Sequence, residues 1–274
     1  MGKKEKTRFL IVWLVITLVF LVGSFVVPSP EKTETVKVMM RDAVLHEENR
    51  CSFFGLMSVS PAMISAMVVS GILLLAALLI RIFAIPRFKM VPGKFQSAIE
   101  LLVSTFDNLA KTNSPRRNSF LGVYAFGAGV YIFVGTIFEL FGVQVMTISG
   151  HSVSLPAPLS DVNAAISLGV LSYFVIFAGG ILGNGVKGIS LGLKKFSLPL
   201  SMSFRLFGAL LSGLLVTELV YYYASLSYVL PVIVAVLFTL LHALIQSYVL
   251  TLLTTMFYGE LNAPLPKKVK PAKA

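Results

Sequence analysis

Residues 196–223 read FSLPLSMSFRLFGALLSGLLVTELVYYY, and the interpretation of the whole sequence depends on them. The stretch is long and apolar enough to cross a bilayer, which takes about 20 residues. It nevertheless contains Arg205 near its start and Glu218 further along. A charged side chain at the bilayer centre costs about 2.5 to 3.5 kcal/mol, so such residues usually mark a functional site. We therefore expect Arg205 to lie on an ion path.

The composition is typical of an α-helical membrane protein. Of the 274 residues, 56% are hydrophobic and 13% are charged, and the mean hydropathy is +0.86. We predict an all-α polytopic membrane protein with a hydrophobic N-terminal segment, residues 1–28, and one membrane domain, residues 29–274. The single Cys51 cannot form an internal disulfide, and no Cys/His cluster indicates a metal, so no cofactor is expected.

The basic residues follow a membrane topology. The formal net charge is +11, which could indicate nucleic-acid binding, but the Lys and Arg residues are concentrated in short loops and tails. Eighteen of the 23 lie in segments predicted to be inside, and four lie in residues 29–58, predicted to be outside. This distribution obeys the positive-inside rule. It argues against a nucleic-acid partner, predicts a cytoplasmic C-terminus, and leaves Arg205 in neither group.

Five core membrane helices are predicted, of which the last two form a long C-terminal hairpin with its turn near residues 225–228. The five segments are residues 60–80, 120–145, 162–181, 197–223 and 228–258. Residues 91–112 place apolar side chains at helical spacing and predict an amphipathic helix on the inner membrane surface. Residues 9–27 are either a retained helix or a secretory signal, and the length of the run and the lack of an A-x-A site favour retention.

Arg205 and Gln246 fall at about the same level of the predicted hairpin. Arginine stays protonated in proteins, so Arg205 can repel cations, hold a carboxylate or block a leak, but cannot carry a proton by titration. The alternative is a side chain that snorkels to the membrane surface. Lys194 and Lys195 mark that surface ten residues earlier, at about 1.5 Å per residue, which is too far for an easy snorkel. Gln246 offers Arg205 a carbonyl acceptor, or else makes an ordinary hydrogen bond between helices.

Three carboxylates form a second pattern. Glu139, Asp161 and Glu218 all fall in the predicted outer half of the membrane, whereas the inner half offers neutral polar side chains. They predict a polar inlet for a cation, and so two dissimilar half-paths with Arg205 between them. Solvation at the membrane interface is the alternative for Glu139 and, with equal weight, for Asp161.

His242 lies four residues before Gln246, on the same helix face. It could relay protons because its pKa is ordinarily near neutrality, although a packing role is commoner for a lone His and is preferred. Hydroxyl side chains continue inward from Gln246, and they either line an aqueous path or bond to the preceding turn of their own helix. These residues are Ser247, Thr251, Thr254 and Thr255. The sequence has no HExxH or GxSxG motif, and nothing supports catalysis by this chain alone.

Four segments together resemble the motifs of subunit a of F-type ATP synthases. They are VPGKFQSAIELLV, PLSDVNAAISL, LSMSFRLFGALLSG and LIQSYVLTLLTTMFYGE, at residues 91–103, 158–168, 200–213 and 244–260. Each match alone is weak. All four occur in the order found in that family, and with the predicted topology they form a specific signal.

The resemblance implies a non-catalytic stator subunit in a bacterial inner membrane, in contact with a rotating ring of c subunits and with the subunit b stalk. Arg205 matches the family's essential Arg, Gln246 matches its Gln on the final helix, and Asn163 matches a polar residue of the PLSDVNAAISL segment. Ions would enter by one half-channel and leave by the other, which couples the gradient to ATP synthesis or hydrolysis. The choice between H⁺ and Na⁺ stays open.

The sequence departs from the family pattern at three positions. Ala209 replaces a frequent Asn, and Leu214 and Thr239 replace an acidic residue and a His or Glu. Glu218, one turn beyond Leu214, and His242, nearly one turn from Thr239, are candidate replacements, although by level they are not expected to touch.

A self-contained secondary cation transporter or channel is the alternative class. Such proteins often contain an internal repeat, and this sequence has none that we detect.

Overall fold

The computed structural model describes residues 3–26, 41, 51–53, 57–116, 119–146, 148, 150, 152–222 and 235–264. Within this part of the chain, four helical segments are long and apolar enough to cross a membrane. They are Pro61–Arg87, Ser119–Phe141, Val162–Asn184 and Val236–Asn262. The predicted class, an all-α polytopic membrane protein, is confirmed. The remaining predicted segment, residues 197–223, forms a helix of 26 residues, Ser197–Tyr222.

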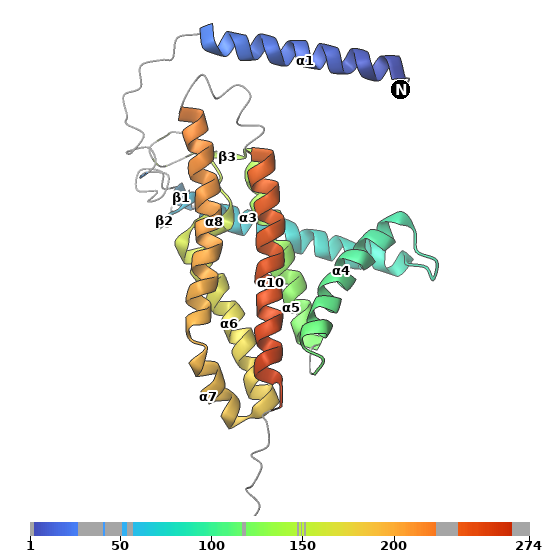
Figure 1. Ribbon diagram of the computed structural model, residues 1–274, viewed down its shortest axis with the longest axis vertical. Coiled ribbons are helices and arrows are strands. Elements are labelled where there is room, and N and C mark those ends of the chain that lie inside the picture. Colours follow the sequence, from blue (N-terminus) through green and yellow to red (C-terminus); the bar gives the residue numbers. More distant parts are fainter. Residues whose placement is uncertain are drawn as a thin grey trace, which may run out of the picture.

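Figure 1 labels the helices and colours them in chain order, from blue at the N-terminus to red at the C-terminus. They are α1 (Lys3–Val26), α3 (Pro61–Leu79), α4 (Lys94–Asn113), α5 (Ser119–Phe138), α6 (Val162–Asn184), α7 (Val186–Lys194), α8 (Ser197–Tyr222) and α10 (Leu240–Asn262). Short π-helical or 3-10 turns extend several of them: η1 (Ile80–Ala84), η2 (Ile85–Arg87), η3 (Glu139–Phe141), η4 (Pro158–Ser160) and η5 (Ala235–Thr239). The predicted turn of the C-terminal hairpin lies outside the described residues.

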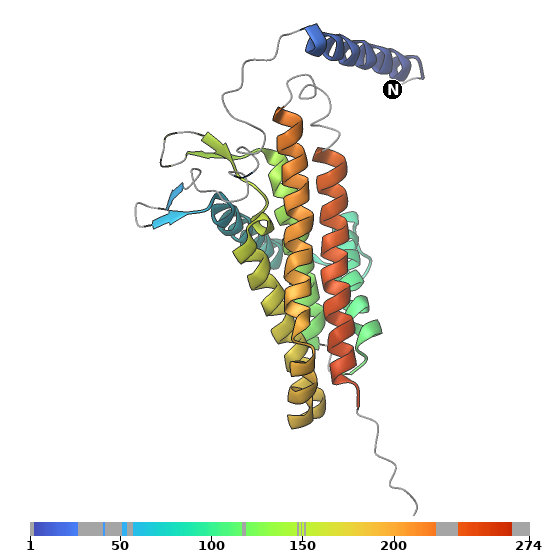
Figure 2. The same cartoon turned by 60° about the vertical axis from the view of Figure 1, so that its left-hand side comes forward.

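Two short antiparallel hairpins, which were not predicted from the sequence, project from one side of the helices (Figure 2). They are β1 (Cys51–Phe53) with β2 (Met57–Val59), and β3 (Gln144–Met146) with β4 (Ser152–Ser154). The second hairpin shortens the predicted membrane segment that ran to residue 145. Gly142 has a φ of 58°, a left-handed conformation that glycine adopts without strain, and it ends the helical part before β3 begins.

Helices α5, α6, α8 and α10 form the bundle that holds the core (Figures 1 and 2). Helix α6 packs against both α8 and α10, and α10 also packs against α5, while direct contact between α8 and α10 is slight. Ile132, Ile176 and Leu206 are buried where these helices meet. The C-terminal hairpin is therefore held together mainly through α6.

Small residues allow the helices to approach closely. In a membrane, helix association depends on tight packing because lipid is as apolar as the side chains. A Cβ at Gly129 of α5 would overlap the ring of Phe106 from α4, and a Cβ at Gly179 of α6 would overlap the ring of Tyr258 from α10. The bundle is closed at points where a side chain larger than hydrogen would not fit.

The glycine-rich stretch GGILGNGVKG is a sharp corner between α6 and α7. Gly185 has a φ of 58° and ends α6, after which the chain reverses. A Cβ at Gly188 would overlap the carbonyl group of Gly180, so the two backbones touch directly. The short helix α7 was not predicted from the sequence.

Helix α3 runs across the long axis that α8 and α10 share (Figures 1 and 2). It is strongly apolar, and the buried residues on it, Pro61, Ala62, Ser65 and Val69, are confined to its first half. The axis of α3 and the shared axis of α8 and α10 cannot both be parallel to the membrane normal. Position along α8 is therefore not a simple measure of depth in the membrane, although the sequence analysis used it as one.

The amphipathic segment predicted at residues 91–112 forms α4. Its second half packs on the bundle, where Phe106 meets Phe126 edge to face with ring centroids 5.9 Å apart. The Asn113 amide donates to the Thr255 hydroxyl of α10 at 3.0 Å. Its first half keeps Phe95 62% exposed, which leaves an apolar side available to lipid.

Candidate functional site

Arg205 lies on the exposed face of α8. Helical spacing places Ser201, Phe204, Gly208 and Ser212 on the same exposed face. The opposite face packs against α6 through buried side chains, which include Met202, Ser203, Leu206 and Leu210. Helix α8 therefore directs its cation away from the bundle.

The surface around Arg205 is apolar. Phe204 is 65% exposed on α8, and η5 and α10 add exposed apolar side chains at helical spacing. These are Leu237, Leu241, Leu244 and Tyr248. Among the described residues, no ion pair or hydrogen bond involves the Arg205 guanidinium. The solvation or the counter-charge of a cation on such a surface must come from outside the chain.

Gly208 lies one turn from Arg205 and faces open space. A Cβ built there meets no atom within 4 Å, and the same holds for Gly213. By contrast, a Cβ at Gly169 of α6 would overlap the Ser203 hydroxyl of α8. Packing within the chain thus explains the glycine at 169 but not the one at 208, which leaves room for another surface to approach Arg205.

Gln246 faces the interior of the bundle. It is 6% exposed and shares the buried side of α10 with Ala243 and Leu250. Its Oε1 has no hydrogen-bond partner among the described atoms. No described hydrogen bond joins it to Arg205, which points outward from α8. The amide oxygen expected to accept from Arg205 is therefore buried and open, and an unpaired buried acceptor costs about 1 to 3 kcal/mol.

The hydroxyl side chains of α10 bond to backbone carbonyls. Ser247 donates to Gly129 O of α5 at 2.8 Å, whereas Thr251 and Thr254 donate to Ser247 O and Leu250 O of their own helix at 2.7 and 2.8 Å. Thr255 donates to Leu252 O at 2.9 Å. Of the two interpretations left open by the sequence, the structure favours bonds to the backbone over an aqueous path along these residues.

Glu139 and His242 line the same small cavity. Its volume is about 10 Å³, and it is lined by residues of α5 and η3, of α8, and of η5 and the start of α10. The other lining residues are Thr136, Ala209, Leu210, Gly213, Phe238 and Thr239. A cavity of this size holds about one water molecule. It therefore places a carboxylate, an imidazole and two hydroxyl side chains around one water-sized space.

His242 is oriented by its own helix turn. Its Nδ1 lies 2.8 Å from Phe238 O, and its ring stacks on that of Phe238 with centroids 5.7 Å apart. Because a carbonyl oxygen only accepts, Nδ1 carries the hydrogen of this bond. Nε2 is then the ring nitrogen that can exchange a proton.

Asp161 caps α6 and joins it to α3. Its Oδ1 accepts from the backbone N–H of Asn163 at 2.7 Å, and its Oδ2 accepts from the Ser60 hydroxyl at 2.8 Å. Ser60 is itself the N-cap of α3. A carboxylate beside helix N-termini is stabilised by their positive ends. Asn163 stands exposed in the first turn of α6 and contributes its backbone N–H.

Glu218 lies in the helical stretch of α8, but its side chain is outside the described residues, as is that of Leu214. The suggested replacement of the missing family acid by Glu218 therefore stays a prediction. The described part of the chain has no group of three or more His, Cys, Asp and Glu residues that could hold a metal ion.

The family of the ATP synthase A chain matches this sequence over residues 63–259. The chain belongs to the ATP synthase A chain family. The match extends from α3 almost to the end of α10, so it includes Arg205, Gln246 and the cavity of Glu139 and His242. The resemblance to subunit a of F-type ATP synthases is confirmed. Membership makes the chain a multi-pass membrane subunit of the ATP synthase complex, with a part in ATP synthesis and ion transport.

One contact at the base of the hairpin was missed by sequence reasoning. The Lys195 ammonium lies 2.8 Å from a Glu260 carboxylate oxygen and 5.2 Å from the centre of the Phe257 ring. These contacts join the turn before α8 to the end of α10. Opposite charges at the two ends of a predicted hairpin were a usable signal, because antiparallel helices bring those ends together.

Proposed function

We propose that this A chain conducts ions, in the first place protons, through two half-channels at an interface with a ring of c subunits. In this role it couples the transmembrane gradient to ATP synthesis or hydrolysis. The observation that carries the proposal is the position of Arg205, a permanent cation on an exposed and otherwise apolar helix face. Membership of the ATP synthase A chain family favours a subunit of a complex over a self-contained transporter.

The proposed ring interface is the face formed by α8 and α10. A ring carboxylate reaching Arg205 would supply the counter-charge that the described chain lacks, and the attraction would favour the ionised form of that carboxylate. Ion release from the ring is thereby promoted next to Arg205. The open space at Gly208 supports close approach of a partner helix.

The cavity of Glu139 and His242 is the proposed inlet for protons. A carboxylate and an imidazole around a water-sized space can pass a proton between them through one water. We propose that the family's missing acid and His positions, Leu214 and Thr239, are compensated by this pair, with Glu139 in η3 and His242 in α10. Asp161 and Asn163 belong to the same proposed path nearer the outer surface, and Glu218 is retained as a candidate on α8.

Gln246 is proposed to act on the other side of Arg205. Its open Oε1 can accept from a water molecule or from a guanidinium N–H after a side-chain rearrangement. Because the hydroxyls further along α10 bond to carbonyls, the second half-channel is proposed to pass outside this buried stripe.

The remaining assignments follow from the same proposal. The chain is a non-catalytic stator subunit that contacts the subunit b stalk, lies in a bacterial inner membrane and has a cytoplasmic C-terminus. Residues 1–28 form a separate N-terminal segment, for which α1 provides a helix from Lys3 to Val26. Retention of that helix stays a prediction.

The decisive experiment measures ATP-driven proton pumping in inverted membrane vesicles with Arg205→Ala. We expect coupled pumping to be lost while the complex still assembles, because the exposed side chain makes no described contact within the chain. Ser201→Ala is the matched control, since it alters the same exposed face one turn earlier and should leave pumping unchanged. Native pumping rates with Arg205→Ala would show that Arg205 is structural and the proposal wrong.

A further inference from the structure

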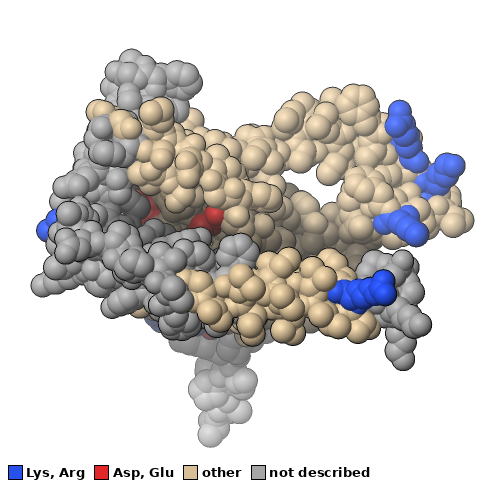
Figure 3. Space-filling view, turned by 90° about the horizontal axis from the view of Figure 1, so that it is seen from above, with Lys and Arg blue, Asp and Glu red and all other residues tan. Residues whose placement is uncertain are grey.

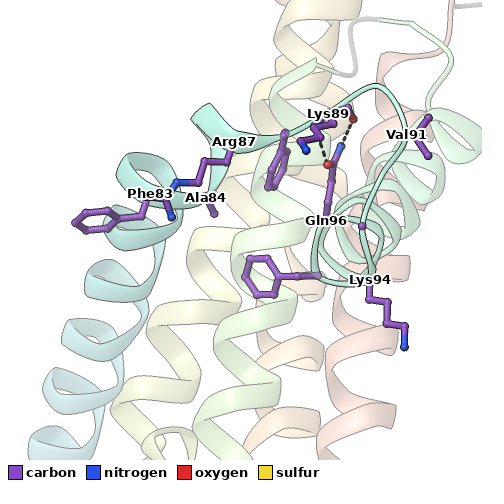
Figure 4. A pocket seen from close by; sticks show the side chains of 10 residues that line it. Phe83, Ala84, Arg87, Lys89, Val91, Lys94 and Gln96 are labelled. Atoms are coloured by element: carbon purple, nitrogen blue, oxygen red, sulfur yellow. Dashed lines mark hydrogen bonds between the residues drawn. The ribbon is translucent and has the colours of Figure 1, made fainter.

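A cavity of about 710 Å³ lies far from the ion path, between the end of α3 and the start of α4. Figure 4 shows Arg87 and Ala84 on the α3 side and Lys94 on the α4 side. The lining residues are Phe83, Ala84, Arg87, Phe88, Lys89, Val91, Gly93, Lys94, Phe95 and Gln96. Its volume falls within the roughly 300 to 1,000 Å³ of small-molecule sites.

The lining combines positive charge with apolar surface. Arg87, Lys89 and Lys94 are exposed, no acidic residue lines the cavity, and no ion pair is formed by these three in the described chain. Figure 3 shows several Lys and Arg side chains close together at the upper right, on the side where Figure 1 places the end of α3 and the start of α4, and no acidic group is visible among them. The apolar share comes from rings that include Phe83 and Phe95, which are 56% and 62% exposed. Such a surface suits an anion that carries hydrocarbon.

The loop over the cavity is held in place by one side chain. The Lys89 backbone N–H donates to Gln96 Oε1 at 3.0 Å, and Gln96 Nε2 donates to Lys89 O at 2.9 Å and to Glu100 Oε1 at 2.7 Å. The dashed lines of Figure 4 mark the two bonds between Gln96 and Lys89. Glu100 is therefore engaged with Gln96, and the loop that carries the cationic side chains has a defined shape.

The cavity lies at the end of an apolar helical segment, Pro61–Arg87, that is long enough to cross a membrane. It begins where the apolar helix α3 ends, and α4 presents exposed apolar side chains beside it. Along α3 and its continuation η1, Leu75, Leu79 and Phe83 follow at intervals of four residues and are 57%, 46% and 56% exposed. An apolar strip on one face of α3 thus leads directly to a lining residue of the cavity.

We propose that this cavity binds the headgroup of an acidic phospholipid of the inner leaflet. The phosphate and any further negative group lie among Arg87, Lys89 and Lys94, and the acyl chains follow the exposed strip of α3. Basic groups at the inner surface attract anionic lipids, and guanidinium groups bind phosphate oxygens in a bidentate manner. The leaflet rests on the proposed topology, but the site itself does not depend on the proposed ion path.

The test counts the lipid retained by the purified complex. Delipidated complex is reconstituted with equal amounts of phosphatidylglycerol and phosphatidylcholine that carry identical acyl chains, and the lipid bound after purification is measured by mass spectrometry. The variant is R87Q/K94Q. The matched control is K187Q/K194Q, which removes two exposed basic side chains from α7.

We expect the native complex to retain phosphatidylglycerol preferentially, R87Q/K94Q to lose that preference several-fold, and K187Q/K194Q to keep it. Equal loss in both variants would mean general surface attraction, and no loss in either would mean that another subunit covers the cavity; both results overturn the proposal. If R87Q/K94Q does not assemble, Lys94→Gln alone provides the same readout, because Lys94 has no described side-chain bond.

A second arm separates a lipid from a small anion. Inorganic phosphate or soluble glycerophosphoglycerol is added in excess during reconstitution. We expect neither to displace the retained phosphatidylglycerol, because each lacks the acyl chains that contact α3. Displacement by either would assign the cavity to a free phosphate compound and overturn the lipid proposal. Since lipid retention is measured without proton pumping, its failure is separate from failure of the proposed function.

Discussion

The Ser60 hydroxyl donates to the Asp161 carboxylate across 2.8 Å, so that the N-cap of α3 is bonded to the N-cap of α6. One carboxylate thereby serves two helix starts that are distant in the sequence. The bond fixes the start of α3 on the bundle, although the rest of α3 runs across it.

Asp161→Ala is expected to destabilise the chain by about 0.5 to 2 kcal/mol, the usual cost of losing an N-cap, with a further loss from the broken link to Ser60. Asp161→Asn should cost less because its amide oxygen still accepts from the Asn163 N–H. The measurement is the fraction of complex that remains assembled after heating. Asn163→Ala is the control, since the Asn163 contribution comes from the backbone; a larger effect there than at Asp161 would contradict the capping role.

Glu139→Gln is expected to slow proton translocation about 100-fold or more, the usual scale of a positioned proton-transfer group, because the amide cannot take up and release a proton. Glu139→Asp should retain part of the rate. His242→Gln should slow translocation similarly, and the double variant should be little slower than either single one, because both residues serve one step. Pumping in inverted vesicles gives the rates. Independent, multiplying effects would show that the two side chains do not share a path.

Gln246→Leu separates stability from function. Removing a buried amide whose oxygen is unpaired is expected to raise the heat resistance of the chain, because up to about 1 to 3 kcal/mol of desolvation cost is relieved. Ion transport should fall, because the open acceptor near the path is lost. Thermal stability and pumping are measured on the same preparation. A variant that is less stable than the native chain would mean that Gln246 is bonded in the assembled complex.

Gly208→Val and Gly169→Val are both expected to abolish proton pumping, but for different reasons. At position 208 the added side chain meets open space, so the chain should assemble normally while pumping is lost as the partner is kept away. At position 169 the side chain would overlap Ser203, so the amount of assembled complex should fall. Immunoblots of assembled complex, beside pumping assays, distinguish the two. Normal pumping with Gly208→Val would exclude close contact at this face.

The ends of several elements were predictable because local chemistry determines them. The sequence placed a membrane helix at residues 60–80, and α3 begins after the Ser60 cap with Pro61 in its first turn. The segment predicted at residues 162–181 likewise begins after Asp161, as α6. By contrast, the segment predicted to run to residue 145 ends earlier, at Gly142, because hydropathy alone does not separate an apolar helix end from the apolar strand β3.

The orientation of side chains on the hairpin was not predictable. Helix α8 is apolar around most of its circumference, so its sequence has no stripe to indicate which face packs on α6. Arg205 and Gln246 fall at one level of the predicted hairpin, which suggested that they meet. The packing of α8 and α10 on α6 instead leaves Arg205 on the exposed face of α8 and buries Gln246 inside the bundle. The shared cavity of Glu139 and His242 depends on how α5 packs against α10, which no spacing within either segment reveals.

The backbone contact between Gly180 and Gly188 bears on how the chain withstands mechanical load. A partner that slides along α8 would drag on a helix whose main support is α6, and α6 continues into α7 through this corner. Side-chain contacts yield by changing rotamer, whereas two touching backbones have no rotamer to change. The junction between α6 and α7 is therefore rigid, and elastic deformation under load should occur within the helices and not at this junction.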